Sequence, residues 1–98
     1  MRDVKDSIAI LRIDFHIPEA QSLKDKRMVI KSLKDRIHRE FNVSIAELDA
    51  LDKWQVGTLG CAMIGNDNRY MNQCLEHIVS SIERHNGIQI CEHQIEFI

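Results

Sequence analysis

The sequence predicts an α+β fold of the ferredoxin-like type, in which two helices cover one face of a four-stranded antiparallel sheet. Three observations lead to this prediction: two segments with helical periodicity, four short segments with β-like composition, and their order, βαββαβ. Two amphipathic helices each need a surface to bury against, and one face of such a sheet supplies it. The other face of the sheet then stays open.

The first predicted strand covers residues 7–17, where alternate residues form two sets that differ in character. One set is wholly apolar and should face the core, whereas the other begins apolar and becomes charged towards Pro18, which ends the strand. The predicted core set is Ala9, Leu11, Ile13, Phe15 and Ile17. The predicted open-face set is Ile8, Ile10, Arg12, Asp14 and His16.

The first predicted helix follows Ser22, which stands three residues before Asp25 at the spacing of a capping box. Apolar residues then recur at near-helical intervals as far as Phe41. This apolar face consists of Leu23, Val29, Ile30, Leu33, Ile37 and Phe41.

Three further elements complete the predicted unit after a short strand at 42–48. A strand is expected within 56–65, and the turn at 65–67 precedes a helix that ends near Asn86 and Gly87. The last strand takes residues 88–98. Its open-face set is expected to be Ile88, Ile90, Glu92, Gln94 and Glu96. The phenylalanines assigned to the core are Phe15, Phe41 and Phe97.

The 98 residues are enough for a single domain, residues 1–98, and not for two. No apolar run approaches the length needed to cross a bilayer, and the first seven residues lack the apolar region of an export signal, so a cytoplasmic protein without membrane attachment is expected. Three cysteines without a CxxC pair favour neither disulfides nor a zinc site. We therefore expect no metal and no cofactor.

Thirteen basic and fifteen acidic residues give a net charge of −2, which excludes a polycation that coats nucleic acid. Any affinity for phosphate must then come from a local patch. The first helix supplies one, because its cations fall within one sector at 100° per residue. This basic stripe comprises Lys24, Arg27, Lys31, Lys34 and His38.

The basic stripe has two interpretations. It is either a solvated helix face whose long side chains cover apolar surface, or a binding surface for RNA phosphates. Lys24, Lys26 and Arg27 crowd the helix start, where the helix dipole disfavours cations and only Asp25 offsets them. Cations placed against the local field suggest an external anion. The predicted RNA or anion contacts are Lys24, Lys26, Arg27, Lys31 and Lys34.

Trp54 lies in an acidic connection with Asp49 and Asp52, and either clamps the hairpin between the middle strands or anchors a protein contact. Two carboxylates in one loop are weak support for a cation site.

The alternative to RNA binding is a homo-oligomeric or partner-binding module that uses the apolar end of the open sheet face. The predicted partner-binding residues are Trp54, Gln55, Ile8 and Ile10, with Ile88 and Ile90 beside them.

No catalytic set assembles from the sequence. Asp14 and His16 share a strand face, but no nucleophile or glycine-rich phosphate loop accompanies them, and a surface ion pair with Arg12 is the favoured interpretation. Cys91 and His93 would supply only half of a tetrahedral metal site. We therefore expect a protein that is not an enzyme.

Residues 16–67 resemble the bacterial YlxP-like family, a domain family of unknown function. The segments that carry the resemblance are SLKDKR, KSLKDR, FNVSIAE and the loop containing Asp and WQ before TLG. The matching positions are Ser22, Leu23, Lys24, Lys26, Arg27, Lys31, Ser32, Leu33, Trp54 and Gln55. This chain departs from the family in a longer charged amino terminus and in GND at 65–67, where relatives commonly have SND.

The resemblance implies a ferredoxin-like fold and supplies no catalytic residue. Genes of this family often stand beside genes for transcription antitermination, translation initiation and ribosome maturation, which implies a role near RNA. The resemblance therefore favours RNA or ribosomal particles as partners, and the basic first helix as the functional surface.

Overall fold

The computed structural model describes residues 6–98, so the charged stretch at residues 1–5 lies outside the described residues. The elements follow the predicted order βαββαβ. They are β1 (Ser7–His16), α1 (Leu23–Glu40), β2 (Ser44–Asp49), β3 (Val56–Gly65), α2 (Asn68–Glu83) and β4 (Gln89–Phe97). The second strand therefore begins two residues later than predicted and ends one residue later.

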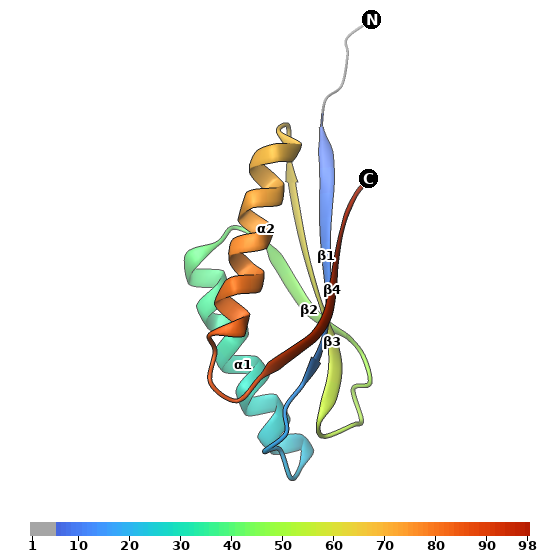
Figure 1. Cartoon of the computed structure of the whole chain (residues 1–98), viewed down its shortest axis with the longest axis vertical. Helices are drawn as coiled ribbons and strands as arrows, with labels where there is room; N and C mark the ends of the chain where they lie inside the picture. The colour runs from blue at the N-terminus through green and yellow to red at the C-terminus, as the bar shows by residue number, and fades with distance from the viewer. Residues whose placement is uncertain (1–5) are drawn as a thin grey trace, which may run out of the picture.

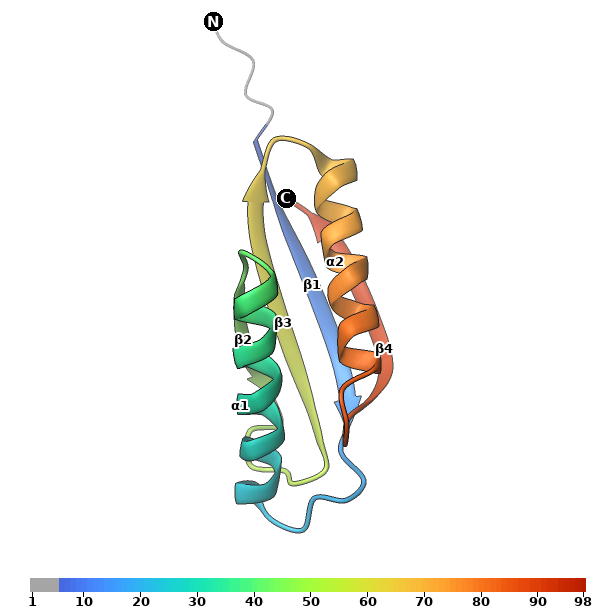
Figure 2. The same cartoon turned by 90° about the vertical axis from the view of Figure 1, so that its left-hand side faces the viewer.

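The four strands form one antiparallel sheet in the order β2-β3-β1-β4, and both helices lie on the same face of it (Figure 1). The predicted ferredoxin-like architecture is thus confirmed. In Figure 2, α1 lies over the β2 side of the sheet and α2 over the β4 side. The sheet edges are β2 and β4, and within residues 6–98 no helix or strand covers the face away from α1 and α2 (Figure 1).

Both helices begin at the predicted caps. The Ser22 side-chain oxygen accepts a hydrogen bond from the Asp25 backbone N–H at 3.0 Å, and the Asp67 side chain accepts one from the Tyr70 N–H at 3.1 Å. After α2 the chain turns at Gly87, whose φ of 93° lies in the left-handed region that glycine adopts without strain.

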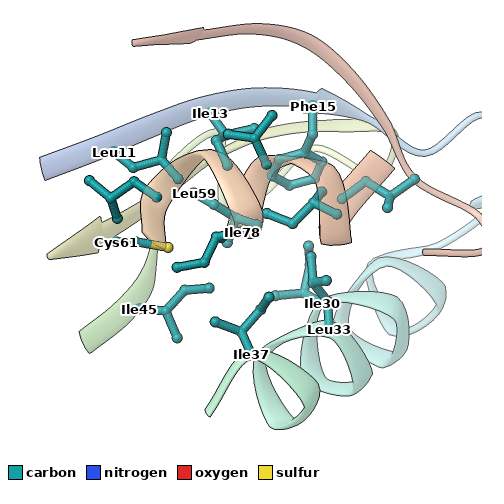
Figure 3. Packing of buried hydrophobic residues seen from close by; sticks show 14 of the residues in the cluster. Leu11, Ile13, Phe15, Ile30, Leu33, Ile37, Ile45, Leu59, Cys61 and Ile78 are labelled. Atoms are coloured by element: carbon teal, nitrogen blue, oxygen red, sulfur yellow. The ribbon is translucent and has the colours of Figure 1, made fainter. Parts of the chain in front are cut away.

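The core lies between the helices and the covered sheet face (Figure 3). The apolar set predicted on β1 is buried there, as are Ile30, Leu33 and Ile37 of α1 and Leu59 and Cys61 of β3. The buried set on β1 and its extension is Ala9, Leu11, Ile13, Phe15 and Ile17. The periodicity of two in the first strand therefore identified its inner face correctly.

The predicted open face of the last strand is wrong in its first half. A β-bulge changes the register of β1 with β4 between Asp14, which pairs with Glu92, and Phe15, which pairs with Ile90. Because Cys91 is an extra residue in β4, the residues before it face the opposite side of the sheet from the one predicted. Ile90 therefore packs against the core, and Ile88 is buried in the core. The expectation that Phe97 belongs to the core is also wrong, because Phe97 is exposed near the end of edge strand β4.

Candidate nucleic-acid interface

The basic stripe on α1 is presented to solvent. Lys24, Arg27, Lys31 and His38 are exposed and Lys34 is half-buried, on the flank of a helix whose opposite face is buried by Ile30, Leu33 and Ile37. The helix is amphipathic because its apolar residues recur with the helical period, and the same period aligns the cations along one flank. Four of the five predicted anion contacts therefore share one accessible surface: Lys24, Arg27, Lys31 and Lys34.

A groove of about 410 Å³ runs beside this stripe, between α1 and edge strand β2. Ile30 and Glu47 line it together with the cations, so the groove has apolar as well as charged surface. Its lining residues are Arg27, Ile30, Lys31, Lys34, Asp35, His38 and Glu47. We call this hollow the α1–β2 groove.

Lys26 is not an anion contact, which corrects the prediction made from the sequence. Its side chain is only 1% exposed, and its ammonium group points inward. The Lys26 Nζ lies 2.7 Å from Glu47 Oε2 and donates to the backbone oxygens of Ala50 at 2.7 Å and Lys53 at 2.8 Å. Three oxygens thus lie within 2.8 Å of the Lys26 Nζ, which is also 5.9 Å from the centroid of the Phe15 ring.

The sequence contains a signal for this burial. Lys26 stands four, seven and eleven residues before Ile30, Leu33 and Ile37, so it lies in phase with the apolar face of the helix. Glu47 likewise stands two residues after buried Ile45 on β2, so the two side chains share the inner face of the strand. Two opposite charges, each at a core-facing position, predict a buried ion pair between the two elements.

The buried ion pair determines the charge of the α1–β2 groove. Because the Lys26 ammonium group neutralises Glu47, that carboxylate does not cancel the exposed cations. Arg27, Lys31 and Lys34 then face only one other carboxylate in the groove, that of Asp35, which leaves an excess of two positive charges (three minus one). The groove is a local cationic site in a chain whose net charge is −2.

Lys31 and Asp35 form an ion pair at 2.9 Å, one helical turn apart. The hydrogen bond from Lys31 and its charge hold the pKa of the Asp35 carboxyl below its ordinary value. Both side chains are exposed, and such pairs contribute little to stability, so Lys31 can exchange this partner for a phosphate oxygen at low cost.

The predicted partner-binding residues lie at two separate places. Ile8 and Ile10 are on the open sheet face, where Ile8 is exposed and Ile10 is half-buried. Trp54 projects into solvent from the connection between β2 and β3. The Gln55 side-chain nitrogen donates to the backbone oxygens of Pro18 at 3.2 Å and Ala20 at 3.0 Å, so this amide holds the loop in place.

The pairing of Asp14 with Arg12 that the sequence favoured is wrong. Asp14 instead accepts a hydrogen bond from the Thr58 hydroxyl at 2.8 Å, between the paired strands β1 and β3.

Within residues 6–98, no three His, Cys, Asp or Glu side chains are grouped so that they could hold a metal ion. In that same part of the chain, neither helix has the length and apolar character required to span a bilayer.

Comparison with known proteins places this chain in a family. Residues 8–95 match the family described as "Protein of unknown function (DUF503)". The chain is 34% identical over 67 residues to the "Uncharacterized protein YlxP" of Bacillus subtilis (strain 168), covering 68% of this chain and 73% of that protein.

Among solved structures, the chain is similar to "De novo designed protein Foldit4", with a TM-score of 0.54 and 17% identity over 95% of this chain and 96% of the other. At this identity the similarity concerns the fold alone. The match over nearly the whole chain shows that the chain belongs to the DUF503 family, a family of unknown function, and its identity to YlxP makes it a relative of that protein.

Proposed function

We propose that this protein is a non-enzymatic accessory factor that binds the phosphates of RNA, either free or in a ribosomal particle, through Lys24, Arg27, Lys31 and Lys34 of α1. The observation that carries the proposal is the uncompensated positive charge of the α1–β2 groove, where the buried Lys26 neutralises Glu47. Phosphate contacts from such cations supply affinity that does not depend on sequence.

The length of the stripe suits several phosphates. Lys24 and Lys34 are ten residues apart, which at 1.5 Å per residue is about 15 Å along the helix axis. One nucleic-acid strand advances by roughly 3.4 Å per phosphate along a duplex axis, so a backbone lying along α1 presents about four phosphates over this distance. The stripe therefore supports binding of a backbone segment rather than of a single anion.

The open face of the sheet supports backbone binding rather than base reading. Sheets that recognise single-stranded bases stack them on aromatic side chains, as RRM domains do. On β1 the open face carries Ile8, Ile10, Arg12, Asp14 and His16 instead. The RNA-binding mode that we propose therefore depends on charge and shape.

Charge reversal on the stripe tests the proposal. The test variant carries Lys24→Glu, Arg27→Glu and Lys31→Glu, and the matched control carries Lys53→Glu, Arg69→Glu and Arg84→Glu. The control cations are also exposed, and each triple change alters the net charge by −6. Fluorescence anisotropy with a labelled single-stranded 12-mer RNA, and co-sedimentation with ribosomal subunits from the organism that encodes the protein, measure binding.

We expect the test variant to lose at least tenfold in affinity, because each lost phosphate contact removes a counterion-release term, while the control keeps most of its affinity. Thermal unfolding verifies that both variants fold. Equal losses in test and control variants would attribute binding to net charge alone, and undiminished binding by the folded test variant would contradict the proposal.

A second candidate function is self-association through the apolar end of the open sheet face. Ile8, Ile64 and Ile98 are 42%, 74% and 72% exposed there. They are neighbours, since Ile8 pairs with Ile64 in register and exchanges backbone hydrogen bonds with Ile98. Such a patch favours contact with a second copy. Sedimentation equilibrium at micromolar concentration should then show dimers that Ile64→Ser dissociates, and a monomer at all concentrations would refute this candidate.

A further inference from the structure

We propose that the β2–β3 loop, residues 50–55, is a rigid docking site for a partner protein, namely a segment that presents an apolar side chain beside a lysine or arginine. This surface is distinct from the basic stripe, so the inference goes beyond the proposed RNA binding and does not depend on it. It follows from the exposure of apolar side chains, the fixation of the loop and the charge around it.

The loop and the strand ends beside it expose large apolar side chains. Leu51 and Trp54 are 57% and 53% exposed, and Leu48 and Val56 on the flanking strands are exposed as well. Trp54 therefore does not clamp the hairpin by burial, which was one of its two interpretations from sequence. Clusters of exposed apolar residues on soluble proteins mark interaction sites, and tryptophan is enriched where binding energy concentrates.

The loop is nevertheless held at several points. The buried Lys26 ammonium group binds the backbone oxygens of Ala50 and Lys53, and the Gln55 amide group binds the segment before α1. The Gln55 backbone oxygen accepts from the Ile17 N–H at 2.7 Å. Ala50 has a φ of 58°, a left-handed conformation that costs free energy for alanine and persists because these bonds impose it.

Fixation and exposure together favour a recognition role. Two of the three Lys26 contacts go to the loop backbone, while the most apolar side chains of the loop remain in water, so these two bonds fix the shape of the loop and not a core made by it. A loop already held in one conformation loses little entropy when a partner binds. The Leu51 and Trp54 side chains are therefore presented as preorganised anchors.

The charge around the loop selects the partner. A shallow, open depression beside Trp54 is lined by Asp52, Lys53, Trp54, Gln55 and Val56, and an apolar side chain of a partner can pack against the Trp54 ring there. The carboxylates of Asp52 in the loop and of Asp49 at the end of β2 outnumber the Lys53 ammonium group, so this surface carries a net charge of −1 and favours a cationic partner. A partner segment with an apolar residue next to lysine or arginine matches both features.

The test uses the fluorescence of Trp54, which is the only tryptophan in the chain. The probes are three ten-residue peptides: one with a central leucine flanked by arginines, one with the arginines replaced by glutamates, and one with the leucine replaced by serine. We expect only the first to shift the Trp54 emission to the blue with a saturable dependence on peptide concentration.

Variants locate the binding site. Leu51→Ser should weaken binding of the arginine–leucine peptide by about tenfold, and Asp52→Asn by a few fold. The control Met28→Ser removes an apolar side chain of similar exposure from α1, 62% against 57% for Leu51, and should leave binding unchanged. Urea denaturation confirms that each variant is folded.

Four results would overturn the proposal. They are the absence of any shift, equal shifts by the arginine and glutamate peptides, a shift produced by protein concentration alone, and a shift produced by a 12-mer of uridine. The third would assign the loop to a second copy of this chain and the fourth would assign it to RNA. Because the stripe variants leave this loop intact, RNA binding and peptide binding can fail separately.

Discussion

Replacing Lys26 by methionine should destabilise the protein strongly, even though it removes no apolar contact. Methionine has a similar length and fills the same space, so the packing around Phe15 is preserved. Glu47, whose side chain is only 17% exposed, would lose the charge that compensates it, and two backbone oxygens would lose their donor. Removing one partner of a buried ion pair costs about 3–5 kcal/mol.

Urea denaturation followed by circular dichroism measures this effect. With a denaturant dependence of about 2 kcal/mol per molar, the loss lowers the midpoint by roughly 2 M. The matched control is Lys24→Met, which removes an exposed lysine from the same helix and should change stability by less than about 0.5 kcal/mol.

A double variant separates the charge from the packing. In Lys26→Met with Glu47→Leu, both members of the buried pair become apolar, which is often neutral for stability, so the double variant should regain much of the loss. It should not regain all of it, because the Ala50 and Lys53 oxygens still lack their donor. A single variant that loses less than about 1 kcal/mol would refute the account of Lys26 as a buried anchor.

Three further predictions concern other parts of the molecule. Lys24→Glu should raise stability by about 0.3–1 kcal/mol in thermal unfolding, because a carboxylate suits the start of α1, while it weakens RNA binding; a loss of stability would contradict this. Burial raises the pKa of the Cys61 thiol to about 12, so iodoacetamide should label exposed Cys91 and spare Cys61 in the native state, as mass spectrometry can show. Burial, and then the Arg36 charge, lower the pKa of His85 below 6.5, so the unfolded chain binds more protons there. Stability measured by urea should therefore fall as the pH drops from 7 through 6.5 to the lower native pKa, and His85→Asn should reduce this dependence.

Local signals in the sequence predicted most of the fold. The alternation in β1 identified its buried face, and Ser22 and the turn at 65–67 marked the starts of both helices, because caps and periodicity depend on nearby residues. The bulge at Cys91 was missed, since an extra residue in one strand is defined only by its pairing with another. The facing of Ile88 and Ile90 was wrong for that reason.

The candidate site was predicted in part. The helical period placed Lys24, Arg27, Lys31 and Lys34 on one flank, but the groove beside them also needs β2, whose position is a tertiary feature. The prediction of Lys26 as an anion contact is wrong because it rests on the charge of the side chain and ignores its position in phase with Ile30 on the buried face of the helix. A lysine in phase with apolar residues is informative only once the opposite charge that buries with it is found, here in Glu47.

The salt dependence of RNA binding shows how many phosphates the α1 stripe neutralises. If Lys24, Arg27, Lys31 and Lys34 neutralise four phosphates of a single strand, the logarithm of the binding constant should fall with the logarithm of salt concentration with a slope of about −3. Reversing three of these charges should bring the slope close to −1, because one contact remains. A slope near zero in the unaltered protein, or the same slope in the reversed variant, would contradict the claim that the α1 stripe binds RNA.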